Sequence, residues 1–219
     1  MVSTFVYVGI IALVFILIFI AVYYYYILPR NNNIYKYAIP LLTDETVFDE
    51  SFSKNLILQT LVSPRDTLYV PEIGYGLTFA WEMYMPALSG NDKWQHNFNT
   101  LKPIITFGDT IISYHPKKNY LSISVKYRNN PFYVQFAEVK FNEIKLQCWL
   151  KYVILIDNRH IRLFIGGSLV STKTLPSVVT IDDIKTDIDL GQKNNNFLGK
   201  IKNLTLYPFP LSYNEITSL

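Results

Sequence analysis

The sequence has only one cysteine, Cys148, among its 219 residues. A single thiol excludes an intrachain disulfide framework, and secreted domains of this size more often carry paired cysteines. Cys148 lies in an apolar, strand-like run, so we expect it to be a thiol of the buried core. The scarcity of cysteine therefore favours a reducing, cytosolic environment for the folded part of the chain.

Strong charge of either sign is also lacking. Lys and Arg number 20 against 17 Asp and Glu, the net charge is +3, and charged residues make up 17% of the chain. This balance excludes the basic surface of a nucleic-acid-binding protein. Aromatic residues are instead abundant at 16%, and they favour β-sheets over helices.

No charged side chain precedes Arg30, and residues 5–28 are almost entirely apolar. A helix of about 24 residues is roughly 36 Å long and exceeds the roughly 30 Å hydrocarbon core of a bilayer. We therefore expect residues 1–29 to form a transmembrane α-helix in contact with membrane lipid. A cleaved signal peptide is one alternative, but the segment lacks a basic start and a small-x-small cleavage site. A buried core helix is the other, but helices of globular proteins rarely stay apolar on every face. The residues that represent the predicted anchor are Phe5, Ile16, Tyr23, Tyr26 and Leu28.

Two basic residues lie close to the predicted span, Arg30 and Lys36, and both follow it. The positive-inside tendency places the C-terminal domain of such a single-pass membrane protein on the cytosolic side, in a cell membrane or a virion membrane. The sequon Asn203-Leu204-Thr205 indicates the opposite side. It lies, however, within an apolar strand pattern rather than in an exposed loop.

Residues 30–53 are predicted to be a linker because they contain Pro40 and two acidic pairs, and residues 54–219 are long enough for one domain with a single core. In this domain short β-rich runs recur at roughly ten-residue spacing, with turn signals between them. This pattern predicts an all-β fold, an antiparallel β-sandwich or jelly roll. The expected strands are 56–62, 77–84, 104–107, 110–114, 121–127, 132–136, 146–156, 161–165, 169–170, 188–190 and 201–207.

Five segments of this domain follow one another in an order that resembles the laminin-G-like branch of the concanavalin A-like lectin/glucanase superfamily. The segments are 77–84, which holds a Trp in an alternating run, 148–153, 161–170, 190–201 and 206–216. The resemblance covers about residues 54–219 and implies a concanavalin A-like jelly roll. The positions with an expected structural role are Trp81, Trp149, Gly167, Gly191, Gly199 and Tyr207.

Several of these positions also have a physical interpretation of their own. Trp149 lies in the longest strand-like run, which predicts a core aromatic. Gly166-Gly167 supply the positive φ of a tight hairpin, and Gly199 lets a strand turn back. Leu211 and Ile216 are spaced to fasten a short terminal segment onto the sandwich.

Enzymatic activity is not expected. Glycoside hydrolysis needs two carboxylates that flank the sugar bond, and the glucanases of this superfamily place them on one strand in an E-x-D-x-E pattern. The sequence has no such triplet. A degenerate glycan-processing enzyme is therefore the least favoured alternative.

No resident cofactor is predicted, although the resemblance implies a Ca²⁺ site at the sandwich rim, for which carboxylate oxygens are suitable ligands. A solvated acidic edge that discourages strand aggregation is the alternative. The candidate ligands are Asp182, Asp183, Asp187 and Asp189, with Asp109 or Asp157 at turns. Zinc is not expected, because no histidine has a partner at ligand spacing. The histidines are His96, His115 and His160.

Two binding functions remain. The main hypothesis is a membrane-anchored scaffold that binds protein, such as a minor capsid protein linking an internal membrane to the capsid shell of a large DNA virus. The alternative is a cell-surface carbohydrate-binding or adhesion module, which requires the opposite orientation. Four aromatic residues are candidates for a platform that binds sugar rings. The alternative is that they have ordinary structural roles in the core and on the surface. The candidates are Tyr69, Tyr75, Trp94 and Tyr114.

Overall fold

The computed structural model describes residues 14–20, 38–57, 76–86, 99–130, 133–142, 144–179 and 187–219. The chain divides into two compact units, residues 1–38 and 39–219.

In the first unit the described part is a helix over residues 14–20. Its large apolar side chains are exposed, and Ile16 retains 57% of its accessible surface. The remaining representatives of the predicted anchor, Phe5, Tyr23, Tyr26 and Leu28, lie outside the described residues. Among the described residues, no helix is both long and apolar enough to cross a membrane.

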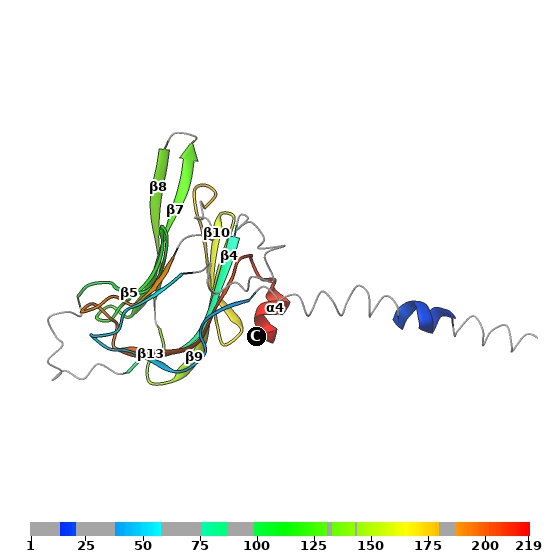
Figure 1. Ribbon diagram of the computed structural model, residues 1–219. Coiled ribbons are helices and arrows are strands. Elements are labelled where there is room, and N and C mark those ends of the chain that lie inside the picture. The colour runs from blue at the N-terminus through cyan, green and yellow to red at the C-terminus, as the bar shows by residue number, and fades with distance from the viewer. Residues whose placement is uncertain are drawn as a thin grey trace, which may run out of the picture. The chain divides into compact units, whose positions relative to one another are not determined.

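The second unit contains two antiparallel sheets, which Figure 1 shows as two layers. Sheet A has seven strands in the order β1-β13-β4-β9-β10-β11, and β2 also pairs with β13. Its strands are β1 (Ile39–Leu42), β2 (Thr46–Phe48), β4 (Gly76–Tyr84), β9 (Trp149–Asp157), β10 (His160–Ile165), β11 (Ser168–Thr174) and β13 (Gly199–Tyr207).

Sheet B has six strands in the order β3-β12-β5-β6-β7-β8. One short helix, α4 (Tyr213–Ser218), follows the last strand of sheet A. The strands of sheet B are β3 (Lys54–Leu56), β5 (Lys102–Phe107), β6 (Thr110–His115), β7 (Tyr120–Asn130), β8 (Tyr133–Asn142) and β12 (Ile188–Leu190).

A single apolar core lies between the sheets. In β4 every second side chain points into it, and none of the four is more than 1% exposed: Leu77, Phe79, Trp81 and Met83. The ring of Phe79 meets that of Phe107, on β5 of sheet B, edge to face with centroids 6.4 Å apart. The predicted antiparallel β-sandwich is therefore confirmed.

The sandwich begins earlier in the chain than the sequence indicates. β1 and β2 lie within the predicted linker, and both pair with β13. β1 is an edge strand, where Pro40 is tolerated although it has no N–H to donate. Phe48 is fully buried, and its ring lies 4.3 Å from that of Phe52 and 5.0 Å from that of Phe197. The linker prediction therefore extends too far, since residues 39–53 belong to the folded domain.

Glycines allow two sharp turns in sheet A. Gly166 and Gly167 form the two-residue loop between β10 and β11, with φ of +57° and +80°. Positive φ at both positions matches the right-handed twist of the flanking strands. At the start of β13, a Cβ on Gly199 would lie 2.2 Å from a ring carbon of Phe197. Any larger residue there would displace that buried ring.

Gly191 permits a polar junction between residues 49–52 and the loop before β13. Its φ is +67°, and a Cβ at this position would approach Oδ1 of Asn196 to 2.6 Å. That oxygen accepts a hydrogen bond from the backbone N–H of Gln192, while Nδ2 of Asn196 donates to the carbonyls of Asp49 and Phe52. The side chain of Asn196 thus joins two segments that are distant in the sequence.

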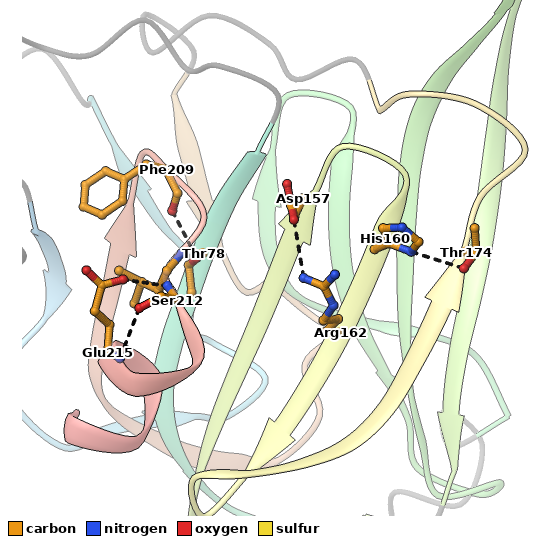
Figure 2. Close-up of polar contacts among 9 residues, drawn as sticks. Thr78, Asp157, His160, Arg162, Thr174, Phe209, Ser212 and Glu215 are labelled. Atoms are coloured by element: carbon orange, nitrogen blue, oxygen red, sulfur yellow. Dashed lines mark hydrogen bonds and ion pairs between the residues drawn. The ribbon is translucent and has the colours of Figure 1, made fainter.

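The C-terminal segment packs on the outer face of sheet A (Figure 2). Thr78 donates from Oγ1 to the carbonyl of Phe209 at 3.1 Å and accepts from the N–H of Leu211 at 3.0 Å. Ser212 and Glu215 form a capping box that starts α4. Leu211 and Ile216 are 2% and 1% exposed. Their burial agrees with the prediction that they fasten this segment onto the sandwich. Tyr207, at the end of β13, is also buried, and its ring meets that of Phe209 edge to face.

Two residues near the start of β9 differ from the prediction. The strand begins at Trp149, so residues 146–148 are not part of it, and Cys148 is half-buried rather than a core thiol. Trp149 is also half-buried, because the register turns Leu150 toward the core and Trp149 to the outer face. The core position opposite β4 is filled by Tyr152, which pairs with Trp81.

Candidate binding surface

Part of the outer face of sheet A carries a row of large polar and aromatic side chains. The register sets Tyr84 of β4 opposite Trp149 of β9 and opposite Lys200 of β13. Two residues away on the same face, Glu82 lies opposite Lys151 and Lys202. We call this surface the β4–β9–β13 platform. It consists of Glu82, Tyr84, Trp149, Lys151, Lys200, Lys202 and Asn203.

An aromatic pair forms the apolar part of the platform. The rings of Tyr84 and Trp149 lie with their centroids 5.8 Å apart and their planes tilted by 45°. Both side chains are half-buried. Tyr84 is the last residue of β4, and Trp149 is the first residue of β9. Amphipathic rings of this kind combine an apolar face with a polar edge, and they are favoured at binding surfaces.

Lys202 joins the aromatic pair to a carboxylate. Its Nζ lies 4.6 Å from the centroid of the Trp149 ring and 3.3 Å from Oε2 of Glu82. A cation over an indole face is attracted by the ring quadrupole. The same ammonium group therefore contacts both the ring and the carboxylate.

Glu82 is the acceptor at the centre of the platform. Its Oε1 accepts a hydrogen bond from Nδ2 of Asn203 at 2.8 Å. Partial burial opposes ionisation, but the hydrogen bonds from Asn203 and Lys202, with the charges of Lys202 and Lys151, lower the pKa of Glu82 below its usual value. Glu82 is therefore ionised at neutral pH.

A β-bulge directs Asn203 to this position. The register of β13 against β4 shifts between Lys202 and Thr205, and Asn203 adopts a φ of +53°. Asparagine tolerates this left-handed conformation better than most residues do, and bulges commonly re-aim a side chain. Asn203 lies within a strand, as the sequence predicts for this sequon, yet its side chain is exposed.

The lysines of the platform differ in their partners. Lys200 pairs with Oε1 of Glu45 at 2.7 Å, and Lys202 pairs with Glu82. Within the part of the chain that the structure describes, Lys151 forms no ion pair. Among the described residues, Lys151 is therefore the platform lysine whose ammonium group is not held by a carboxylate.

The predicted calcium ligands that the structure describes do not form a metal-binding cluster. Asp187 and Asp189 are exposed, and Oδ1 of Asp189 accepts from Nδ2 of Asn55 at 2.7 Å. Asp182 and Asp183 lie outside the described residues. No group of three or more His, Cys, Asp or Glu side chains suited to a metal ion occurs among the residues that were placed.

The two turn aspartates are engaged elsewhere. Asp109 pairs with Lys126 at 2.5 Å, and Asp157 pairs with Arg162 at 3.4 Å, as Figure 2 shows for the second pair. A lysine or arginine already neutralises each carboxylate, which disfavours either as a calcium ligand.

The two histidines that the structure describes lie on different sheets. His160 on β10 lies 3.2 Å from Oγ1 of Thr174 (Figure 2), whereas His115 is buried on β6 of the other sheet. Burial, together with the charges of nearby lysines, lowers the pKa of His115. His96 lies outside the described residues.

Of the four residues in the aromatic platform predicted from the sequence, the structure describes Tyr114. Tyr114 is 3% exposed, and its hydroxyl donates to Oδ1 of Asn119 at 2.9 Å. Burial raises the pKa of Tyr114 to about 12. It is therefore a core residue. The other three candidates, Tyr69, Tyr75 and Trp94, lie outside the described residues.

Comparisons with known proteins support the fold. No protein-family model matches the sequence, and no curated protein matches it. Among solved structures, the binding domain of botulinum neurotoxin serotype G is similar, with a TM-score of 0.55 and 15% identity over 81% of this chain and 44% of that chain. The receptor-binding domain of the botulinum neurotoxin C/D mosaic serotype also has a TM-score of 0.55, with 11% identity over 84% of this chain and 50% of that chain.

The class that the fold defines is thus an all-β sandwich resembling part of these toxin domains. This chain spans half or less of the length of the two chains it matches. At this level of identity the likeness establishes the fold alone.

Proposed function

We propose that this protein is a non-enzymatic glycan-binding module of the lectin type, and that the β4–β9–β13 platform is its sugar site. The observation that carries the proposal is the half-buried pair of Tyr84 and Trp149 beside the hydrogen-bonded Glu82 and Asn203. The solved structures of similar fold are named as binding or receptor-binding domains, which is in keeping with a binding role.

The chemistry of a sugar matches this surface. A pyranose ring has an apolar face of C–H groups that packs against an aromatic ring, and hydroxyls that need hydrogen-bond partners. Trp149 and Tyr84 supply the ring surface. Glu82 supplies acceptor oxygens, and Asn203 supplies an amide. Because Glu82 and Asn203 already bind each other, their orientation is set before a ligand arrives.

The finer assignments belong to the same proposal. The order of motifs supports a laminin-G-like, concanavalin A-like relationship, and the apolar N-terminal segment supports display on a membrane. The lack of an E-x-D-x-E triplet in the sequence supports a role without hydrolysis. The scaffold hypothesis, with a capsid shell as partner, rests on the N-terminal segment and has no counterpart in the platform.

A glycan array tests the proposal. The full-length chain should be purified in a detergent that has no sugar headgroup, since an alkyl glycoside would compete for the platform. We expect binding to defined glycans, and a loss of at least about tenfold in affinity for Trp149→Ala and for Tyr84→Ala.

A matched control is Phe136→Ala, because Phe136 is 62% exposed on β8 of the other sheet. This variant should bind as the unchanged protein does. Absence of binding to every glycan, or binding that survives both platform variants, would overturn the proposal.

A further inference from the structure

The platform has a specific charge arrangement that bears on the kind of sugar it can hold. Two of its lysines are neutralised, Lys200 by Glu45 and Lys202 by Glu82. Lys151 lies on the same face of β9 as Trp149, two residues further along the strand. Two residues of a strand span about 6.6 Å, so the backbone positions that carry these two side chains are roughly one sugar ring apart.

Glu82 and Lys151 form no ion pair, although the charge of Lys151 contributes to the lowered pKa of Glu82. Oε1 of Glu82 accepts from Asn203 and Oε2 pairs with Lys202, and both of these partners belong to β13. Both oxygens of the carboxylate are therefore already engaged by side chains of β13. The ammonium group of Lys151 therefore stays available to a ligand on the β9 side of the platform.

Access to the indole depends on Lys202. Its Nζ lies over the Trp149 ring, so a sugar that stacks on this face takes the place of the ammonium group. We expect Lys202 to keep its ion pair with Glu82 when it leaves, so that the cation–π contact is the contact that is lost. An exposed contact of this kind corresponds to roughly a two- to fivefold change in affinity. A neutral sugar forms no new charge interaction to offset this loss. An anionic sugar forms an ion pair with Lys151 in its place.

We infer that the platform selects anionic glycans, with a pyranose ring stacked on Trp149 and its carboxylate or sulfate group paired with Lys151. This inference rests on the proposed function, because it concerns the ligand class of the same site. The anionic group can come from a sugar acid or from a sulfate ester. The chemistry that both share is a negative group carried close to the stacked ring.

The test is a paired glycan array with the full-length chain, in which each neutral glycan is printed beside counterparts that differ by a sulfate or by a sialic or uronic acid. We expect the acidic members to bind at least about tenfold more tightly at low salt, and the preference to shrink as salt is added. The sulfated and carboxylated arms show which source is used. Preference for either one supports the inference.

Lys151 variants make the test specific. Lys151→Gln should abolish the difference between acidic and neutral members, and Lys151→Arg should retain it. Lys117→Gln, at an exposed turn of the other sheet, should behave as the unchanged protein. Equal or tighter binding of neutral glycans would overturn the inference and leave the proposed function standing. A preference that persists in Lys151→Gln would also overturn it, and failure to bind any glycan would overturn both.

Discussion

The indole of Trp81 stacks on the ring of Tyr152 in the core, with centroids 5.9 Å apart and planes within 18° of parallel. Trp81 is 1% exposed and Tyr152 is fully buried. Within the described residues, neither Nε1 of Trp81 nor the hydroxyl oxygen of Tyr152 has a hydrogen-bond partner. Burial also raises the pKa of Tyr152, so the hydroxyl remains protonated and polar.

Removing the hydroxyl of Tyr152 should not destabilise the protein. A buried polar group without a partner costs about 1–3 kcal/mol, so we expect Tyr152→Phe to leave the free energy of unfolding unchanged or raise it by about 1 kcal/mol. Tyr114→Phe is the matched control, because it loses the hydrogen bond to Asn119 and should cost about 1 kcal/mol. Chemical denaturation measures both. A destabilised Tyr152→Phe would show that the hydroxyl has a partner in solution.

The two tryptophans should differ in their contribution to stability. Trp81→Ala empties a core position and should cost about 3–5 kcal/mol. Trp149→Ala removes a half-buried ring at the start of a strand, and we expect about 1 kcal/mol. Equal losses in denaturant unfolding would contradict the outward placement of Trp149.

The Glu82 network should stabilise the protein in a pH-dependent manner. The folded-state pKa of Glu82 is lowered, so its contribution is present above the unfolded-state pKa and is lost as the pH falls through the folded-state pKa. Thermal melts of the unchanged protein and of Glu82→Gln should differ at pH 7 and converge in acid. A difference that stays constant from pH 7 to pH 3 would contradict the role of ionised Glu82.

The start of the folded domain can be located by truncation. A fragment of residues 39–219 should give a cooperative, mainly β unfolding transition, because it keeps β1 and β2. A fragment of residues 54–219 loses Ile39, Leu41 and Phe48, which are at most 7% exposed. It should aggregate or melt at a clearly lower temperature. Equal melting temperatures of the two fragments would instead support a linker that extends to residue 53.

The orientation in a membrane discriminates between the two binding hypotheses. A cell-surface glycan-binding role requires the domain to face away from the cytosol, although Arg30 and Lys36 predict the cytosolic side. Under the proposed function, residues 39–219 should be protected from protease added to sealed microsomes. Digestion of the domain would favour the scaffold hypothesis instead.

The sequence predicts most of the strands because their signal is local. The alternation in β4 and the glycine pair between β10 and β11 each follow from residues within one short segment. β1 and β2 escape prediction because they have four and three residues and take their place in the sheet by pairing with β13, which lies far along the chain. Short strands of this kind have no periodicity of their own to read.

The platform could not be predicted for a related reason. Tyr84, Trp149 and Lys202 come from three separate parts of the chain, and only the register of β4 with β9 and β13 makes them neighbours. The sequence does hold a partial signal, because Glu82 and Tyr84, Trp149 and Lys151, and Lys200 and Lys202 are each spaced by two. Such spacing places each pair on one face of a strand but does not show which face is outward.

The position of β13 also affects how the protein is made. β13 lies between β1 and β4 in sheet A and pairs with β2 as well, yet it is the last strand along the described chain. The edges of β1, β2 and β4 that pair with β13 therefore stay unpaired until residues 199–207 have left the ribosome. Non-local pairing of this kind slows folding. The sandwich must close after most of the chain has been synthesised, and chaperones that cover exposed strand edges have that interval in which to act.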